Sequence, residues 1–79
     1  MPRYFFNVYD HTVMLDDIGS DLPDLEAVRR EAVRSSTELL RNSDVAHLWS
    51  GKEWRMVVVD EHGAEVLTLR FSASLPSSA

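Results

Sequence analysis

Histidines beside carboxylates are the first residues in this chain that could do chemistry. His11 directly follows Asp10, and His62 follows Asp60 and Glu61. Imidazole nitrogens and carboxylate oxygens together can bind Zn²⁺, Ni²⁺ or Mn²⁺. Both groups fall where tight turns are expected, however, and turns carry polar residues because they face water. The chain has no cysteine and no HExxH motif. We therefore predict no metal site and no cofactor, and keep a small metal-binding protein or enzyme as an alternative.

Four aspartates within nine residues form a second group that could hold Ca²⁺ or Mg²⁺. An EF-hand loop closes with a glutamate at its twelfth position. Counted from the first of these aspartates, that position holds Ala27. Loop solvation and helix capping explain the acids better. The four residues are Asp16, Asp17, Asp21 and Asp24.

A stripe of arginines on the expected helix could grip phosphate. Each arginine follows a glutamate by three or four residues, which is the spacing of neutralising helix pairs. A self-neutralised, solvated helix face is therefore the better explanation. The pairs are Glu26 with Arg30, Glu31 with Arg34, and Glu38 with Arg41.

Nucleophilic catalysis has little support in the sequence. No GxSxG or SxxK motif is present, and the three glycines are isolated, so there is no glycine-rich phosphate loop. A chain of 79 residues also has little room for a deep pocket beside a core. We predict no catalytic residues and a protein that is not an enzyme.

The elements that position these residues follow from periodicity. Strands are favoured by aromatic and β-branched alternation, and the helix by apolar residues at spacings of three, four and seven. Gly63 is expected to take a positive φ in a type I turn with a bulge. A short helical turn within 45–52, carrying Val45, Leu48 and Trp49, could cover the core. The expected strands are 3–9, 12–15, 53–59 and 65–71, and the expected helix is 24–41.

The order of elements predicts an α+β fold. Two hairpins flank one helix, which gives a two-layer ββαββ arrangement with a four-stranded antiparallel sheet and the helix on one face. If the first and third strands are central, the strand order is 2-1-3-4. The two histidine-bearing turns then fall at opposite ends of the sheet. We expect a single domain over 1–75 and a frayed, serine-rich tail over 76–79.

Strand alternation gives this sheet a helix-facing side and an open side. The residues expected to face the helix are Phe6, Val8, Met56, Val58, Leu67, Leu69 and Phe71. The residues expected on the open side are Phe5, Asn7, Tyr9, Arg55, Val57, Val59, Val66, Thr68 and Arg70. The open side holds two arginines and no expected acid. We interpret this apolar, locally basic surface as an interface.

Composition excludes several functional classes. The formal net charge is −5, whereas dedicated nucleic-acid binders normally show a basic footprint. The absence of cysteine excludes a disulfide scaffold. The apolar run after the first residues ends at Asn7, too early for a secretory signal, and no stretch is long enough to span a membrane. We therefore expect a cytoplasmic protein without a membrane partner.

The chain also resembles a known family. The residues that carry the resemblance are the opening MPRYFFNV, the loop DDIG, the helix start LPDLEAVRREA and the ending VVVDEHGAEVLTLRF. They are similar to short uncharacterised alpha-proteobacterial proteins of rhizobial type that carry a domain of unknown function. The resemblance implies a small single-domain bacterial protein and no assigned activity. Val57 and Val59 depart from the family pattern, in which polar residues are more usual.

These observations leave the biochemical function open and favour association. A chain this small gains stability when it associates, so we expect a non-enzymatic interaction module. It would form a homodimer, or bind another protein, through the open side of the sheet or an edge strand. The alternative is a platform of aromatic residues and arginines for nucleic acid, although the net charge argues against a nucleic-acid partner.

Overall fold

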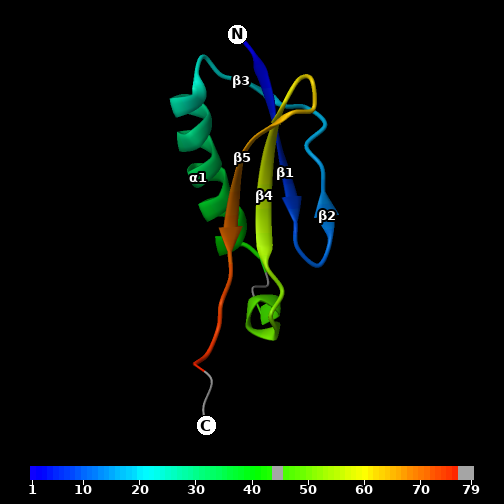
Figure 1. The fold of residues 1–79 in the computed structure, drawn as a ribbon, viewed down its shortest axis with the longest axis vertical. Coiled ribbons are helices and arrows are strands. Elements are labelled where there is room, and N and C mark those ends of the chain that lie inside the picture. The colour runs from blue at the N-terminus through cyan, green and yellow to red at the C-terminus, as the bar shows by residue number, and fades with distance from the viewer. Residues whose placement is uncertain (44–45, 77–79) are drawn as a thin grey trace.

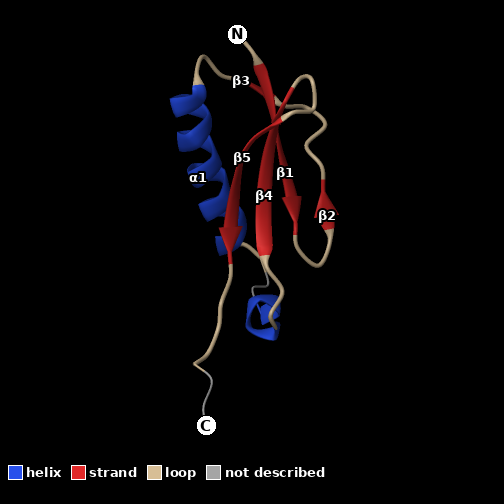
Figure 2. Cartoon of the chain, in the orientation of Figure 1, coloured by secondary structure: helices blue, strands red, loops and turns tan. Residues whose placement is uncertain are grey.

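One long helix packs against one face of an antiparallel sheet in the computed structural model (Figure 1). The structure describes residues 1–43 and 46–76. Figure 2 shows the two layers, with the helix beside the strands and a short 3₁₀ helix beyond one end of the sheet. The elements are β1 (Arg3–Tyr9), β2 (Val13–Met14), β3 (Ser20–Asp21), α1 (Leu25–Arg41), η1 (Ala46–Ser50), β4 (Trp54–Asp60) and β5 (Glu65–Phe71).

The sheet has the order β2-β1-β4-β5, and every pair is antiparallel. This confirms the expected α+β class and the order of the four predicted strands. The sequence predicted four strands, and this number was wrong, because the described part of the chain forms a five-stranded sheet. A fifth strand, β3, pairs with β1 through Arg3 opposite Asp21 and Tyr4 opposite Ser20. Two residues inside a polar loop give no periodic signal, so the sequence could not reveal this strand.

The β1–β4 register places the two histidine-bearing turns far apart. Tyr4 lies opposite Asp60, and Tyr9 lies opposite Arg55. The turn that follows Tyr9 is therefore at one end of the sheet, and the turn that follows Asp60 is at the other. This confirms that the two turns cannot contribute to one site within a chain.

The β4–β5 pairing contains an irregularity that the sequence did not reveal. Val58 lies opposite Leu67, but Val59 lies opposite Glu65, so Val66 is an extra residue. An extra residue re-aims the side chains of a bulged strand. Val66 packs against the hydrophobic core, and its expected place on the open side was wrong. Glu65 takes the open-side position that was expected for Val66.

Helix α1 begins and ends where local chemistry predicts. The Asp24 carboxylate accepts a hydrogen bond from the backbone N–H of Ala27 at 2.8 Å, which satisfies a free donor of the first turn. At the other end, the backbone N–H of Asn42 donates to Leu39, and its side-chain amide donates to the Glu38 carbonyl. The predicted helix, from about Asp24 to Arg41, is therefore confirmed.

The core lies between α1 and the central strands. Leu25 is 45% exposed, and Phe71, which was expected to face inward, is 51% exposed. They lie at the first turn of the helix and at the last residue of the edge strand, where neighbours are few. The buried core cluster consists of Val8, Val28, Ala32, Leu48, Trp54, Met56 and Val58.

Segment η1 covers one end of the core, as expected of a short helical turn. Leu48 is buried, whereas Trp49 is 62% exposed, so only the leucine of this pair serves as a lid. Val45, which was expected to join them, lies outside the described residues, as do residues 77–79 of the expected frayed tail. No helix in the described part of the chain has the length and apolarity to cross a membrane.

Candidate interaction surfaces

The open side of the sheet forms a shallow hollow of about 330 Å³. Six of the nine residues expected there line it together, and Gly63 and Glu65 complete the lining. Phe5 and Asn7 lie opposite Val59 and Val57 in the register. Asn7 is engaged elsewhere, because its side-chain oxygen accepts a hydrogen bond from the Asp16 backbone N–H at 2.9 Å. The six expected residues that line the hollow are Tyr9, Arg55, Val57, Val59, Thr68 and Arg70.

Arg55 already covers part of this hollow. Its guanidinium carbon lies 4.9 Å from the centroid of the Tyr9 ring, which is a cation–π contact. Its Nε is buried and has no hydrogen-bond partner among the described residues. Val57 is only 7% exposed although it belongs to the open side. The centre of the open side therefore exposes less apolar surface to solvent than strand alternation predicts.

The expected local positive charge is offset by two glutamates that were not among the residues expected on the open side. Arg70 Nε lies 3.4 Å from Glu53 Oε1. Glu65 also lines the hollow, because of the irregularity in β5. The interpretation of the open side as locally basic was therefore wrong: Arg55 and Arg70 share the surface with two glutamates.

The outer edge of β1 is covered by the loop that follows it. Strand β2 pairs with the end of β1, and β3 pairs with its beginning. Between them, the Asp16 carboxylate accepts a hydrogen bond from the Phe6 backbone N–H at 3.1 Å. An unpaired strand edge is a template for another chain, and covering it is a usual protection. Residues 10–21 therefore act as a cap on this edge.

Asp16 is the centre of that cap. Its Oδ1 accepts hydrogen bonds from the backbone N–H groups of Ile18 and Gly19. Partial burial raises the pKa of this carboxyl, but hydrogen bonds from Gly19, Phe6 and Ile18 outweigh it, so the pKa lies below the usual aspartate value. The structure thus gives this aspartate a loop-fixing role, while Asp24 caps the helix. The sequence predicted loop solvation and capping for these acids, but not their attachment to β1.

The opposite edge of the sheet, along β5, is unpaired in the described part of the chain. β5 is the last strand in the sheet order and pairs with β4 alone. It has seven residues, and Figure 1 shows it beside α1 with its outer side uncovered by any other strand. Exposed Phe71 ends this edge. The two sheet edges therefore differ: one is capped, and one is free.

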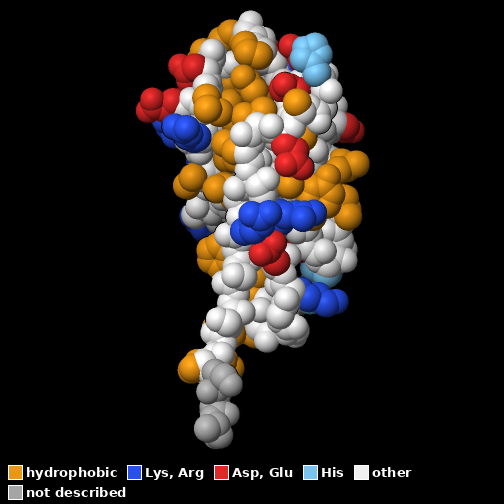
Figure 3. Space-filling model, in the orientation of Figure 1, with side chains coloured by type: hydrophobic (Ala, Val, Ile, Leu, Met, Phe, Trp, Pro, Cys, Tyr) orange, Lys and Arg blue, Asp and Glu red, His pale blue; other side chains and the backbone are white. Residues whose placement is uncertain are grey.

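Exposed apolar side chains also gather on the cap. Figure 3 shows hydrophobic atoms over β2, with charged side chains beside them. Sequence reasoning missed the patch at β2, although an uninterrupted apolar run from residue 13 to 15 was a possible signal. The exposed residues of the cap are Val13, Met14, Leu15 and Ile18.

Among the described residues, the histidines do not gather with acidic side chains into a metal centre. The rings of His11 and His47 stack with their centroids 3.8 Å apart, and Asp10 Oδ1 lies 3.4 Å from His11 Nδ1. The hollow beside them has a volume of only about 10 Å³, room for one water molecule. Among residues 1–43 and 46–76, no three histidine, aspartate or glutamate side chains are arranged to hold a metal ion. His62 lies at the other end of the sheet, in the turn that Asp60 closes by accepting its backbone N–H.

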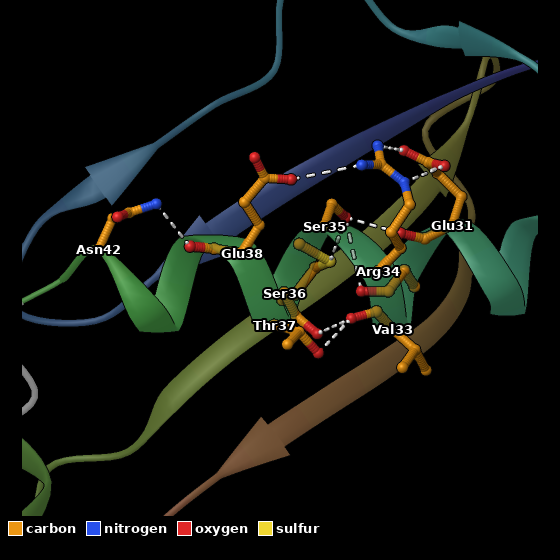
Figure 4. A network of polar contacts seen from close by, with 10 residues as sticks. Glu31, Val33, Arg34, Ser35, Ser36, Thr37, Glu38 and Asn42 are labelled. Atoms are coloured by element: carbon orange, nitrogen blue, oxygen red, sulfur yellow. Dashed lines mark hydrogen bonds and ion pairs between the residues drawn. The ribbon is translucent and has the colours of Figure 1, made fainter.

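The exposed helix face neutralises itself, although not with every expected pair. Arg34 lies between two glutamates in Figure 4, with Glu31 at 2.6 Å and Glu38 at 3.3 Å. The Glu31 carboxylate, with Glu38 adding to it, raises the pKa of Arg34 above the usual arginine value. Glu26 pairs with Arg30, as expected. Glu38 thus pairs with Arg34 rather than with Arg41, and the two glutamates offset the charge that Arg34 could offer to phosphate.

Comparison with known proteins identifies a family without an assigned activity. A family model described as "Domain of unknown function (DUF6894)" matches residues 3–72. We found no match among curated proteins and none among solved structures.

Proposed function

The chain belongs to the DUF6894 family, a domain of unknown function, and we propose that it is a small non-enzymatic interaction module that associates with itself. The surfaces available for this are the open side of the sheet and the edge of β5. The free β5 edge, opposite a capped β1 edge, is the observation that carries the proposal. A protein that covers one edge and leaves the other bare has a natural place for a partner strand.

Size supports the same proposal. A domain of this length buries a smaller share of its surface than a larger one, so association adds a valuable increment of burial. The buried core cluster contains seven residues, while Val33, Phe71 and other large apolar side chains remain exposed. We keep homodimerisation as the leading form of association, and another protein as the alternative partner. Cytoplasmic location and alpha-proteobacterial origin remain predictions.

Sedimentation analysis across micromolar to hundred-micromolar concentration tests the proposal. We expect a monomer–dimer equilibrium in the wild-type chain. Phe71→Lys should weaken the dimer if the β5 edge is used, and Val59→Lys should weaken it if the open side is used. Ser50→Lys, on the exposed surface of η1, is the matched control and should change nothing. A chain that stays monomeric over the whole range contradicts the proposal.

The two alternatives have less support. A base-stacking platform needs accessible aromatic faces, but Arg55 lies over the Tyr9 ring, Glu53 pairs with Arg70, and Glu65 lines the same hollow. A titration of labelled single strands at low salt tests this alternative, and salt-sensitive binding would support it. Metal analysis of the purified chain, with His11→Ala and His62→Ala variants as controls, tests the metal alternative.

A further inference from the structure

We infer that the β5 edge pairs with the same edge of a second copy of this chain, antiparallel, about a twofold axis through Leu69. This inference rests on the proposed self-association and specifies its geometry. A twofold axis through the centre of an edge strand gives each copy the same contacts, which is the usual symmetry of a homodimer. The result would be one continuous sheet with both α1 helices on the same face.

The regular part of β5 sets the position of the axis. The irregularity at Val66 interrupts the ladder, whereas the five residues from Leu67 to Phe71 pair regularly with β4. A bulge disturbs both edges of its strand. Beyond the bulge, the outer edge of β5 is therefore regular over the same five residues. Their midpoint is Leu69. Pairing about this residue uses the whole regular stretch.

The side chains on the helix-facing side of β5 match this register. With the axis at Leu69, this residue lies opposite its own copy, and Leu67 lies opposite Phe71 of the partner copy. All three side chains are apolar. Phe71 is 51% exposed in the single chain, and the partner's Leu67 would cover it. The register therefore accounts for an aromatic residue that the core leaves half-uncovered.

The side chains on the open side are also compatible with this register. Thr68 lies opposite Arg70 of the partner copy, so no like charges face each other across the new pair. An axis at Thr68 instead would place Phe71 opposite the partner's Glu65 and leave the aromatic ring against a charge. A shift of the pairing register by one residue would place the helix-facing apolar side chains of one copy beside the open-side residues of the other. Such a register is strongly disfavoured.

Helix α1 is consistent with the same arrangement. It packs on β4 and β5, and in Figure 4 Val33 and Thr37 project toward the side where β5 runs, while Glu31, Arg34 and Glu38 project away from it. Val33 is 55% exposed. In the paired form, the two copies would turn the sides of α1 that carry Val33 and Thr37 toward each other, with Arg29 and Arg30 beside Val33.

The absence of cysteine from the chain gives a direct test by cross-linking. Residues directly opposite in an antiparallel pair have Cα atoms about 4.5–5.5 Å apart, within the range of a disulfide. Thr68 and its own copy would instead be diagonal neighbours, about 7–8 Å apart and beyond that range. A Thr68→Cys chain mixed with an Arg70→Cys chain should therefore form a disulfide-linked heterodimer under mild oxidation. Each variant alone should stay at background.

Controls separate this geometry from chance collision and from the broader proposal. Thr68→Cys mixed with Thr12→Cys, in the β1–β2 turn, sets the collisional background, and circular dichroism checks that each variant folds. Adding Phe71→Lys to both partners should abolish the specific product. Stronger self-linking of Thr68→Cys than of the mixture would overturn the Leu69 axis. A dimer in sedimentation that gives no linked product would overturn this inference and leave the proposed self-association standing, whereas a monomer would overturn both.

Discussion

Replacing Gly19 by alanine should destabilise the chain far more than the same change at another turn glycine. Gly19 has φ +80°, a conformation that costs a residue with a Cβ about 1–2 kcal/mol. It also lies against β1. A Cβ at this position would come within 2.8 Å of Phe5 Cε1 and 2.9 Å of Arg3 Cγ. Both distances are shorter than van der Waals contact permits.

The magnitude follows from these two costs together. Overpacking of this kind costs about 1–3 kcal/mol, because the neighbours cannot move freely. Arg3 is held by its guanidinium, which donates to the Ile18 carbonyl at 2.6 Å and pairs with Asp21. We therefore expect Gly19→Ala to lower the free energy of unfolding by about 2–5 kcal/mol. A chain of this size has only about 4–12 kcal/mol in total.

Gly63→Ala provides the matched control. Gly63 has φ +82°, but a Cβ there would meet no atom within 4 Å. The gain from a less flexible unfolded chain is the same for both substitutions, so the difference between them isolates the contact with Phe5 and Arg3. We expect Gly63→Ala to cost about 1–2 kcal/mol.

Urea-induced unfolding measures both variants. Trp54 is 4% exposed in the folded chain, so its fluorescence should report the loss of the core. Unfolding at several chain concentrations separates the stability of the fold from any dimerisation. Equal midpoints for Gly19→Ala and Gly63→Ala would refute the reasoning, since the close approach of the loop to β1 would then have no energetic weight.

Three further predictions concern the cap, the helix and the core. Asp16→Asn should lower the free energy of unfolding by about 1–3 kcal/mol at pH 7. The folded pKa of Asp16 lies below its unfolded value of about 3.9, so its stabilising effect is present above that pH and is lost as the pH falls through the folded pKa. Unfolding curves of the variant and the wild type should therefore converge in acid. Asp24→Ala removes the helix cap and should lower the free energy of unfolding by about 0.5–2 kcal/mol, measured by urea titration of the circular dichroism signal at 222 nm. Met56→Ala, at a fully buried side chain, should cost about 2–5 kcal/mol, whereas Met14→Ala, at a half-exposed one, should stay within about 0.5 kcal/mol in the same assay.

The sequence was sufficient to predict α1 and the order of four strands because their signals are local. The helix follows from apolar spacing and from a capping aspartate at residue 24. The second hairpin follows from alternation and from Gly63, whose φ of +82° confirms the expected positive φ. The strand order then follows because short connections and antiparallel pairing leave few arrangements.

Features that depend on contacts between distant residues could not be predicted. Strand β3 exists because Arg3 and Tyr4 offer it a partner edge, not because its own residues favour a strand. The neutralisation of Arg70 depends on Glu53, seventeen positions away in sequence but close across the β4–β5 pair. The stacked rings of His11 and His47 likewise join a turn and η1. A periodic pattern describes one element at a time, and these contacts belong to two.

The treatment of the two sheet edges links stability with association. On the β1 side, the cap replaces the missing neighbour strand: Asp16 binds the Phe6 backbone, and Gly19 packs against Phe5. Those contacts need a glycine and a fixed loop, so their loss should lower the free energy of unfolding whether or not the chain is dimeric. On the β5 side, no part of the described chain plays that role, and Phe71 stays half-exposed. Substitutions there should leave a monomer folded and act on pairing alone. The two edges can therefore be perturbed separately, and a change at Phe71 that unfolded the monomer would mean that β5 is part of the folding core rather than a place for a second copy.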